Sequence, residues 1–129
     1  MKTRIISNRK VAEDHYILYC HCPEIANSAQ SGQFIHVLFD SGSGLLLRRP
    51  FTIYTVEGQQ ISMLYQVIGE GTSILSEMKP GVAIQILGPL GNTFSIAHEL
   101  DLAIVVGGGA GIASLMLLIT ELKKRQIKT

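Results

Sequence analysis

From Lys2 to about Gly88 the chain alternates apolar and polar residues in short runs, separated by turn-forming residues. Alternation with a period of two predicts strands, because successive side chains of a strand point to opposite faces. We expect strands over residues 3–12, 14–22, 33–39, 50–56, 61–68 and 82–88. Many short strands with frequent turns are typical of an antiparallel sheet that closes into a barrel or folds into a sandwich.

Three interruptions of this pattern have a different character. Residues 40–44 are a run of Asp, Ser and Gly that predicts a loop, and residues 23–32 predict a loop or short turn bounded by Pro and Gly. Residues 72–78 predict one short helix, because Thr72 or Ser73 is a good N-cap and a Pro-Gly pair follows its end.

A second kind of pattern begins near residue 100. Residues 102–106 are rich in β-branched side chains, glycines gather at 107–111, and helix-forming residues follow. Strand, glycine turn and helix in this order are typical of the start of a parallel α/β unit. We therefore expect a β domain over residues 1–99 and the start of an α/β domain over residues 100–129.

This second unit is expected to be incomplete, because one strand and one helix cannot form a parallel sheet. The helix expected from about Gly111 to Arg125 is apolar on all sides at 112–119. That predicts either packing against another copy of the chain, as a homodimer, or poor order. The uncharged run 102–119 is long enough for a membrane span, but the glycines in its middle argue against a membrane helix.

Composition narrows the class of protein. The chain has 129 residues, of which 47% are hydrophobic and 16% charged, so it can build a packed core and is unlike a disordered segment. A net charge of +1, without a cluster of basic and aromatic residues, predicts no nucleic-acid partner. The first ten residues lack the apolar stretch of a secretory signal, so we expect a cytoplasmic protein.

Cys20 and Cys22 are the only cysteines in the sequence. On a strand they would point to the same face, at a spacing too strained for an ordinary disulfide. Two thiols alone cannot complete a four-ligand zinc or iron–sulfur site, and neither ligand-spaced histidines nor paired carboxylates stand out. We expect buried or half-buried thiols in a reducing cytosol, no metal site and no catalytic side chain.

The most informative short stretch is Arg-Arg-Pro-Phe-Thr. Arg48 and Arg49 would point to opposite faces of a strand, so that one can face solvent while the other reaches into a cleft. Pro50 lacks an N–H and favours the edge of a sheet. With Phe51 and Thr52 the stretch suits a ligand that has a phosphate and a flat polar ring, because a guanidinium binds phosphate through two parallel bonds. The alternative is a solvated arginine pair beside a core phenylalanine.

Two glycine-rich stretches are candidate anion sites. Gly69 and Gly71 precede Thr72, and free amide groups at the start of a helix attract anions; an ordinary capped helix is the alternative. The second stretch, residues 107–111, lies between an expected strand and an expected helix, as in a dinucleotide-binding turn, although the spacing of its glycines is not G-x-G-x-x-G. Close packing of helix on strand without a ligand is the alternative that we favour for this set, which comprises Gly107, Gly108, Gly109 and Gly111.

Nearly the whole chain resembles the ferredoxin reductase superfamily. The resemblance is carried by four motifs in the expected order: LLLRRPFTIY, LYQVIGEGTSIL, ILGPLGNTF and VVGGGAGIAS. Within the superfamily they are most similar to the electron-transfer subunits of two-subunit, NAD-dependent dihydroorotate dehydrogenases. The resemblance implies an antiparallel Greek-key β-barrel with one short helix that binds FAD, followed by the first strand and helix of a truncated α/β domain that binds NAD.

The resemblance also implies roles for single residues. Arg49 would bind the FAD pyrophosphate together with the amide and hydroxyl groups of Gly71 and Thr72. Thr52 would lie against the isoalloxazine ring, with Pro50 and Phe51 in the same signature. Three residues would line the adenosine–ribityl side, namely Leu64, Tyr65 and Gln66. The nicotinamide nucleotide would be met by Gly107, Gly108, Gly109 and Gly111.

The implied function is that of an electron-transfer module in a flavin-dependent oxidoreductase. Electrons would pass from NADH through FAD toward an iron–sulfur cluster and a catalytic flavoprotein subunit of the dihydroorotate dehydrogenase type, in pyrimidine biosynthesis. NAD(H) and a 2Fe-2S cluster are expected only in the intact family member, so this chain alone is expected to be inactive. Hydrogenase, sulfide dehydrogenase and ferredoxin:NADP oxidoreductase subunits share these motifs, and an assembly barrel without flavin is the alternative from another class.

Overall fold

The computed structural model describes residues 1–39 and 47–129, so the loop predicted at 40–44 lies outside the described residues. The strands are β1 (Lys2–Ala12), β2 (His15–His21), β3 (Phe34–Leu38), β4 (Arg49–Thr52), β5 (Thr55–Glu57), β6 (Gln60–Gln66) and β7 (Ala83–Leu90). The helices are α1 (Pro23–Ser28), α2 (Glu70–Glu77), the 3-10 helix η1 (Gly109–Leu115) and α3 (Met116–Lys124).

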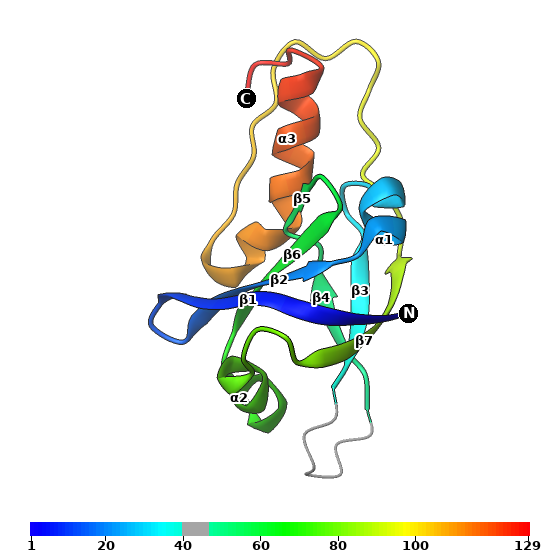
Figure 1. Cartoon of the computed structure of the whole chain (residues 1–129). Helices are drawn as coiled ribbons and strands as arrows, with labels where there is room; N and C mark the ends of the chain where they lie inside the picture. Colours follow the sequence, from blue (N-terminus) through cyan, green and yellow to red (C-terminus); the bar gives the residue numbers. More distant parts are fainter. Residues whose placement is uncertain (40–46) are drawn as a thin grey trace.

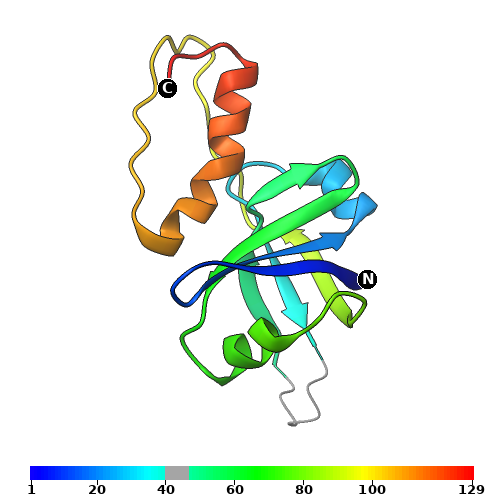
Figure 2. The same ribbon diagram turned by 60° about the vertical axis from the view of Figure 1, so that its left-hand side comes forward.

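In the described part of the chain, the strands form one 7-stranded sheet in the order β4-β3-β7-β1-β2-β6-β5. Every pairing between neighbouring strands is antiparallel. The long strand β1 pairs with β7 near its start and with β2 along its remaining length, so it joins the two halves of the sheet. The sheet curls until β4 contacts β6, which gives the barrel visible in Figures 1 and 2. The predicted antiparallel barrel is confirmed.

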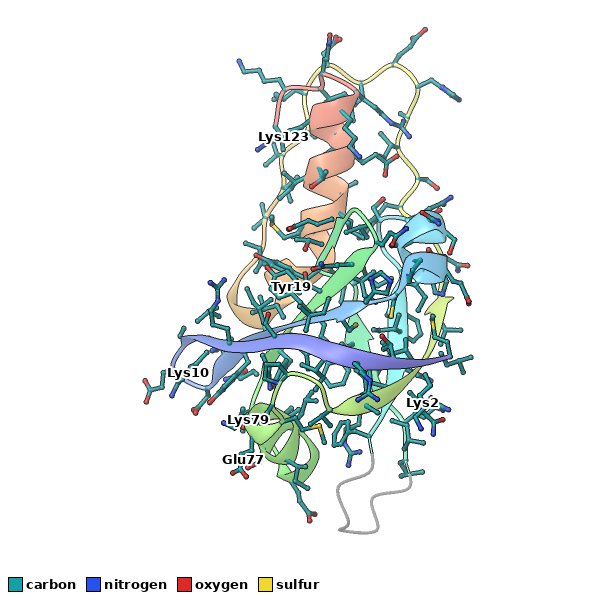
Figure 3. The ribbon with its side chains drawn as sticks, viewed as in Figure 1. Lys2, Lys10, Tyr19, Glu77, Lys79 and Lys123 are labelled. Atoms are coloured by element: carbon teal, nitrogen blue, oxygen red, sulfur yellow. The ribbon has the colours of Figure 1, made fainter. Side chains whose placement is uncertain are left out.

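Alternation along the strands builds the barrel core. Ile5, Leu18, Val37, Met63 and Ile86 point inward from five different strands, and each is at most 2% exposed. Charged side chains at the end of α2 face solvent instead, as Glu77 and Lys79 show in Figure 3. The apolar content of the sequence is therefore gathered into a single core that supports the surface of the barrel from inside.

The segment predicted as one strand over residues 50–56 is two strands in the structure. Strand β4 pairs with β3, whereas β5 pairs with β6, and the chain crosses between them at Ile53 and Tyr54. Ile53 is buried in the core, and the Tyr54 amide donates to the Ser62 carbonyl at 2.8 Å. The β-rich residues run on through this corner, so the sequence pattern alone does not mark it.

The segment 23–32 is predicted as a loop or short turn, and this prediction is wrong for its first part, which forms α1. Pro23 stands at the start of the helix, where its missing N–H costs nothing and its fixed φ suits the helical conformation. Ile25 is 1% exposed and packs into the barrel core. Burial of one apolar side chain thus stabilises a helix that is too short to show a periodic pattern.

The strand predicted over residues 102–106 does not form in the structure. Leu102 makes an isolated parallel bridge to Lys128, and residues 103–108 run extended without belonging to a described strand. Ile104 and Val106 are 83% and 85% exposed. A parallel strand needs neighbours on its sheet, and the described residues supply only the bridge to Lys128.

The C-terminal helix begins as the 3-10 helix η1 and continues as α3, which stands at one end of the barrel beside the extended segment (Figures 1 and 2). Its side chains reach the rest of the chain, because Leu122 is 2% exposed and Leu117 packs against the core. Ser31 donates a hydrogen bond to Glu121 at 2.8 Å. Homodimerisation through this helix stays a prediction.

None of the helices in the described ranges combines the length and the apolar character that crossing a bilayer requires.

Candidate dinucleotide-binding groove

A groove of about 630 Å³ runs between strands β4 and β6 and the start of helix α2. We call it the β4–α2 groove. All the barrel residues that the sequence analysis selected as cofactor ligands line it: Arg49, Pro50, Phe51, Thr52, Leu64, Tyr65, Gln66, Gly71 and Thr72. Residues from three separate stretches of the sequence are therefore brought to one surface by the curl of the sheet.

The two arginines at the start of β4 lie on different sides of the chain. Arg48 directs a guanidinium nitrogen to the Gln85 side-chain oxygen at 3.3 Å, on strand β7 and outside the groove. Arg49 lines the groove. Strand β4 is an edge strand, which suits Pro50 because its ring lacks the N–H that an inner strand would need. The predicted opposite orientation of the arginines is confirmed.

The Arg49 guanidinium lies directly over the backbone of Gly71. A Cβ atom built on Gly71 would be 2.0 Å from the Arg49 Nε atom and 2.4 Å from its Cζ atom. The same guanidinium donates to the Leu47 carbonyl at 3.0 Å and stands 5.5 Å from the centre of the Phe39 ring. These contacts fix a permanent cation at the first turn of α2, and only glycine at position 71 leaves room for it.

Helix α2 begins two residues before the predicted start, with Gly69 as its N-cap. The Thr72 hydroxyl accepts hydrogen bonds from the amides of Ile68 and Gly69 at 3.0 and 3.2 Å, and donates to the Gly69 carbonyl at 3.1 Å. It therefore serves the cap of the helix, and its role as a cofactor ligand stays a prediction. The first amides of a helix have no acceptor inside it and carry its positive dipole end.

Aromatic side chains form the floor of the groove. Tyr65 is 3% exposed, packs edge-on against Phe51 with ring centres 5.9 Å apart, and stacks on Tyr16 at 5.7 Å. Its hydroxyl donates to the Asn8 side-chain oxygen at 3.0 Å. Burial raises the pKa of Tyr65 to about 12, so the phenol stays neutral at physiological pH. Tyr65 thus meets the groove with its ring and not with its hydroxyl.

The glycines of the second stretch are not brought into the groove. Gly107, Gly108, Gly109 and Gly111 are exposed, and only Ala110 and Ala113 of that segment line it. A Cβ on Gly107 would lie 2.8 Å from the Leu115 Cδ1 atom, so this glycine allows the turn to pack closely on the following helix. This contact is the packing alternative raised from the sequence.

Gly69, which the sequence marked as part of a candidate anion site, also lines the groove, whereas four further lining residues were not found from the sequence, namely Ile68, Glu70, Ala110 and Ala113. The first two were within reach of sequence reasoning, because they follow once α2 is started at position 70. The two alanines could not be found, since they enter the groove only through the way in which η1 folds back against β6.

The thiols of Cys20 and Cys22 lie 3.8 Å apart and both residues are fully buried, as predicted for unpaired core cysteines. The hydrogen-bonded Cys22 thiol, together with burial, raises the pKa of Cys20, which keeps that thiol protonated at neutral pH. Among the described residues, no three His, Cys, Asp or Glu side chains gather where they could hold a metal ion.

No protein-family model matches the chain, but individual relatives do. The electron transfer subunit of dihydroorotate dehydrogenase B (NAD(+)) from Caldanaerobacter subterraneus subsp. tengcongensis is 38% identical over 127 residues, which are 98% of this chain and 49% of the relative. The corresponding subunit from Desulforamulus reducens is 36% identical over 121 residues, with 92% and 46% coverage. The chain thus spans about half the length of the relatives it matches.

The fold of the chain also matches solved structures. NADH-dependent reduced ferredoxin-NADP oxidoreductase, studied for flavin-based electron bifurcation, has a TM-score of 0.81 and 31% identity over 95% of this chain and 44% of its own. The ferredoxin NADP+ reductase of Neisseria gonorrhoeae, solved with bound FAD and NADP, has a TM-score of 0.80 over 99% of this chain and 53% of its own. At 17% identity the latter similarity shows the fold alone.

The curled sheet and the fold shared with a solved oxidoreductase at a TM-score of 0.81 confirm the resemblance to the ferredoxin reductase superfamily that is seen in the sequence. Its homologues within that superfamily are the electron transfer subunits of dihydroorotate dehydrogenase B (NAD(+)), with which it shares 33 to 38% of its residues.

Proposed function

We propose that the chain binds FAD in the β4–α2 groove and acts as the flavin-binding part of an electron-transfer subunit. The observation that carries the proposal is the position of the Arg49 guanidinium over Gly71, at the first turn of α2 and inside the groove. A permanent cation and a helix N-terminus at one place both favour a bound anion.

The diphosphate of a dinucleotide fits this corner of the groove for chemical reasons. A guanidinium has five N–H donors, and the bond to the Leu47 carbonyl uses one of them. The amides at the start of α2 add donors with fixed direction and a partial positive charge. Since Gly71 has no side chain, phosphate oxygens can approach its backbone and the guanidinium together.

The remaining groove residues suit a flat ring system with polar edges. Phe51 and Tyr65 give a rigid aromatic floor, and Leu64 lies half-buried on the neighbouring strand position. Thr52 and Gln66 supply polar groups at the rim, and we assign Thr52 to the flavin ring near its reactive nitrogen. FAD, when bound, supplies the redox chemistry, while the residues of this chain bind it, orient it and keep water from one face of the ring.

The wider role follows from the relatives and is part of the proposal. We assign the chain to a complex in which electrons pass from NADH through FAD toward a 2Fe-2S cluster and a catalytic flavoprotein subunit of the dihydroorotate dehydrogenase type, in the cytoplasm. Residues 1–99 would be the FAD-binding domain, and residues 100–129 would begin the NAD-binding domain. Within that second domain the nicotinamide nucleotide would meet Gly107, Gly108, Gly109 and Gly111.

The test of FAD binding is direct. The purified chain is expected to show flavin absorption, or to acquire it on mixing with FAD, at about one flavin for each chain. Heat release of the flavin followed by chromatography separates FAD from FMN, and FAD is the expected species. A colourless chain that takes up no added FAD would overturn the proposal and favour an assembly role for the barrel.

A further inference from the structure

The side chain of Asn8 links three elements that surround the β4–α2 groove. Asn8 stands in the middle of β1, paired with Leu18 of β2, and is half-buried. Its side-chain nitrogen donates to the Leu75 carbonyl at 2.7 Å and to the Met78 carbonyl at 3.3 Å. Its side-chain oxygen accepts the bond from the Tyr65 hydroxyl at 3.0 Å. One amide thus holds both helix α2 and strand β6.

The bonds to Leu75 and Met78 reach the C-terminal end of α2. Leu75 is fully buried and Met78 is the C-cap of the helix. The Leu75 carbonyl also accepts the Met78 amide at 3.1 Å, so the Asn8 nitrogen is a second donor to it, from outside the helix, and ties the helix end to β1. Helix α2 has 8 residues and is therefore roughly 12 Å long. A shift at its C-terminal end is carried as a rigid movement to Gly71 at the other end.

The bond to Tyr65 acts on the aromatic floor of the groove. The Tyr65 ring lines the groove, while its hydroxyl is directed toward β1 and away from it. Stacking on Tyr16 and the edge contact with Phe51 define the plane of the ring, and the Asn8 bond defines its position along that plane. The Asn8 side chain therefore holds both helix α2 and the Tyr65 ring in position.

We propose that Asn8 is a positioning residue of the groove, which sets the start of α2 against Arg49 and holds Tyr65 in place for the dinucleotide. This inference rests on the proposed function. Asn8 is not among the residues that line the groove, so it acts through Tyr65 and α2 and not by touching the ligand.

An asparagine is needed at this position because its amide offers a donor and an acceptor together. Asn8→Asp has nearly the same shape and keeps an acceptor for the Tyr65 hydroxyl, but it has no N–H for the carbonyls of Leu75 and Met78. Tyr65→Phe does the reverse, since it removes the hydroxyl and leaves the bonds to α2. The two variants separate the two halves of the proposed role.

The test is an FAD titration of the whole chain, followed by flavin fluorescence, in wild type, Asn8→Asp and the neighbouring Arg9→Ala as a control. Arg9 is exposed on the same strand. Asn8→Asp removes the side-chain donor that ties the Leu75 and Met78 carbonyls to β1, so its Kd for FAD is expected to rise about tenfold. Arg9→Ala is expected to bind FAD as the wild type does.

A double-mutant cycle with Arg49→Ala distinguishes positioning from general loss of stability. If Asn8 works by setting α2 against Arg49, the effect of Asn8→Asp on Kd shrinks to less than about twofold once Arg49 is alanine. An equal effect in both backgrounds, or a Kd for Asn8→Asp equal to that of wild type, would overturn the inference. Should Asn8→Asp fail to fold, Asn8→Ser takes its place in the cycle.

The outcomes also separate this inference from the function on which it rests. A wild-type chain that does not bind FAD overturns the proposed function. A wild-type chain that binds FAD, together with an Asn8 variant that binds it equally well, overturns only the positioning role.

Discussion

At the scale of single residues, the Arg49 guanidinium occupies the space that a side chain at position 71 would need. The 2.0 Å between a Cβ on Gly71 and the Arg49 Nε atom is far below any real contact, so Gly71→Ala must push the guanidinium out of its place. We expect the Kd of this variant for FAD to rise about tenfold, because the charge-assisted contact is lost or misplaced. The measurement is a flavin titration of the variant beside wild type.

Ser73→Ala is the matched control, because Ser73 is exposed on the same helix and does not line the groove. Both variants place alanine, a good helix former, in α2, so a difference between them reports the contact with Arg49. Equal affinity of Gly71→Ala and Ser73→Ala for FAD would show that the position of the guanidinium does not matter for binding.

The buried phenol of Tyr65 predicts a loss of stability at high pH. Burial raises its pKa from 10.0 to about 12 in the folded chain, so the unfolded chain releases this proton at a lower pH than the folded chain does. The contribution of the neutral Tyr65 phenol to the free energy of unfolding is therefore complete below pH 10 and disappears as the pH rises toward 12. We expect about 2 kcal/mol of unfolding free energy to be lost across that window.

Denaturant unfolding of wild type and Tyr65→Phe between pH 9 and 12 measures this component, because phenylalanine has no proton to lose. The difference between the two proteins is expected to change with pH in the window given by the pKa of Tyr65. A difference that stays constant from pH 9 to 12 would contradict the buried, neutral phenol.

The residues of the groove show what a sequence can and cannot provide. Arg49 and Gly71 were found because each sits in a short motif whose chemistry can be recognised locally. Asn8 was not found, because its role depends on a bond to Tyr65, 57 positions away in the chain. A capping role for Thr72 was expected, but the N-cap is Gly69 and Thr72 stands at the third helical position, since the exact start of a helix depends on which hydroxyl bonds which amide.

At the scale of elements, α3 is held to the barrel by a small number of polar contacts. Ser31 is 3% exposed and donates to Glu121, whose other oxygen pairs with Arg125 at 2.6 Å. Ser31→Ala leaves that carboxylate oxygen without its donor. We expect the amides of α3 to exchange with solvent about fivefold faster, while amides of the barrel strands keep their protection.

Hydrogen exchange resolved along the chain is the measurement, with Ser28→Ala as control. The Ser28 hydroxyl is exposed and bonds only within α1, to the Glu24 and Ile25 carbonyls. Unchanged exchange in α3 of Ser31→Ala would mean that apolar packing through Leu117 and Leu122 holds the helix without help from this bond.

The elements that were predicted correctly are those with a clear period of two and a clear turn at each end, such as β1, β2 and β6. The errors have physical causes. Helix α1 was missed because a single buried Ile25 decides it, and the corner at Ile53 was missed because β-forming residues continue through it. The segment 102–106 has the sequence of a strand, but backbone pairing decides whether a strand forms.

At the scale of the whole molecule, two strongly exposed apolar side chains lie on this extended segment. Ile104 and Val106 are 83% and 85% exposed, while the residues that alternate with them are half-buried. An extended chain with one apolar side and unpaired backbone groups is a template for association. We therefore expect the chain to self-associate as its concentration rises, measured by sedimentation velocity.

Replacing both residues, as Ile104→Lys with Val106→Lys, is expected to shift the chain to the monomer at every concentration tested. Val11→Lys is the control, because Val11 is an exposed apolar residue of a different element, 45% exposed at the end of β1. A wild-type chain that stays monomeric across the same range would contradict a role for this surface in association.

The central claim is that the Arg49 guanidinium at the edge of the barrel binds the dinucleotide. The neighbouring Arg48 provides the control. Arg49→Ala removes the guanidinium over Gly71, whereas Arg48→Ala removes one that bonds Gln85 outside the groove. In an FAD titration of both variants, the account predicts a Kd raised at least about tenfold for Arg49→Ala and within about twofold of wild type for Arg48→Ala. Equal Kd values for Arg49→Ala and wild type would contradict it.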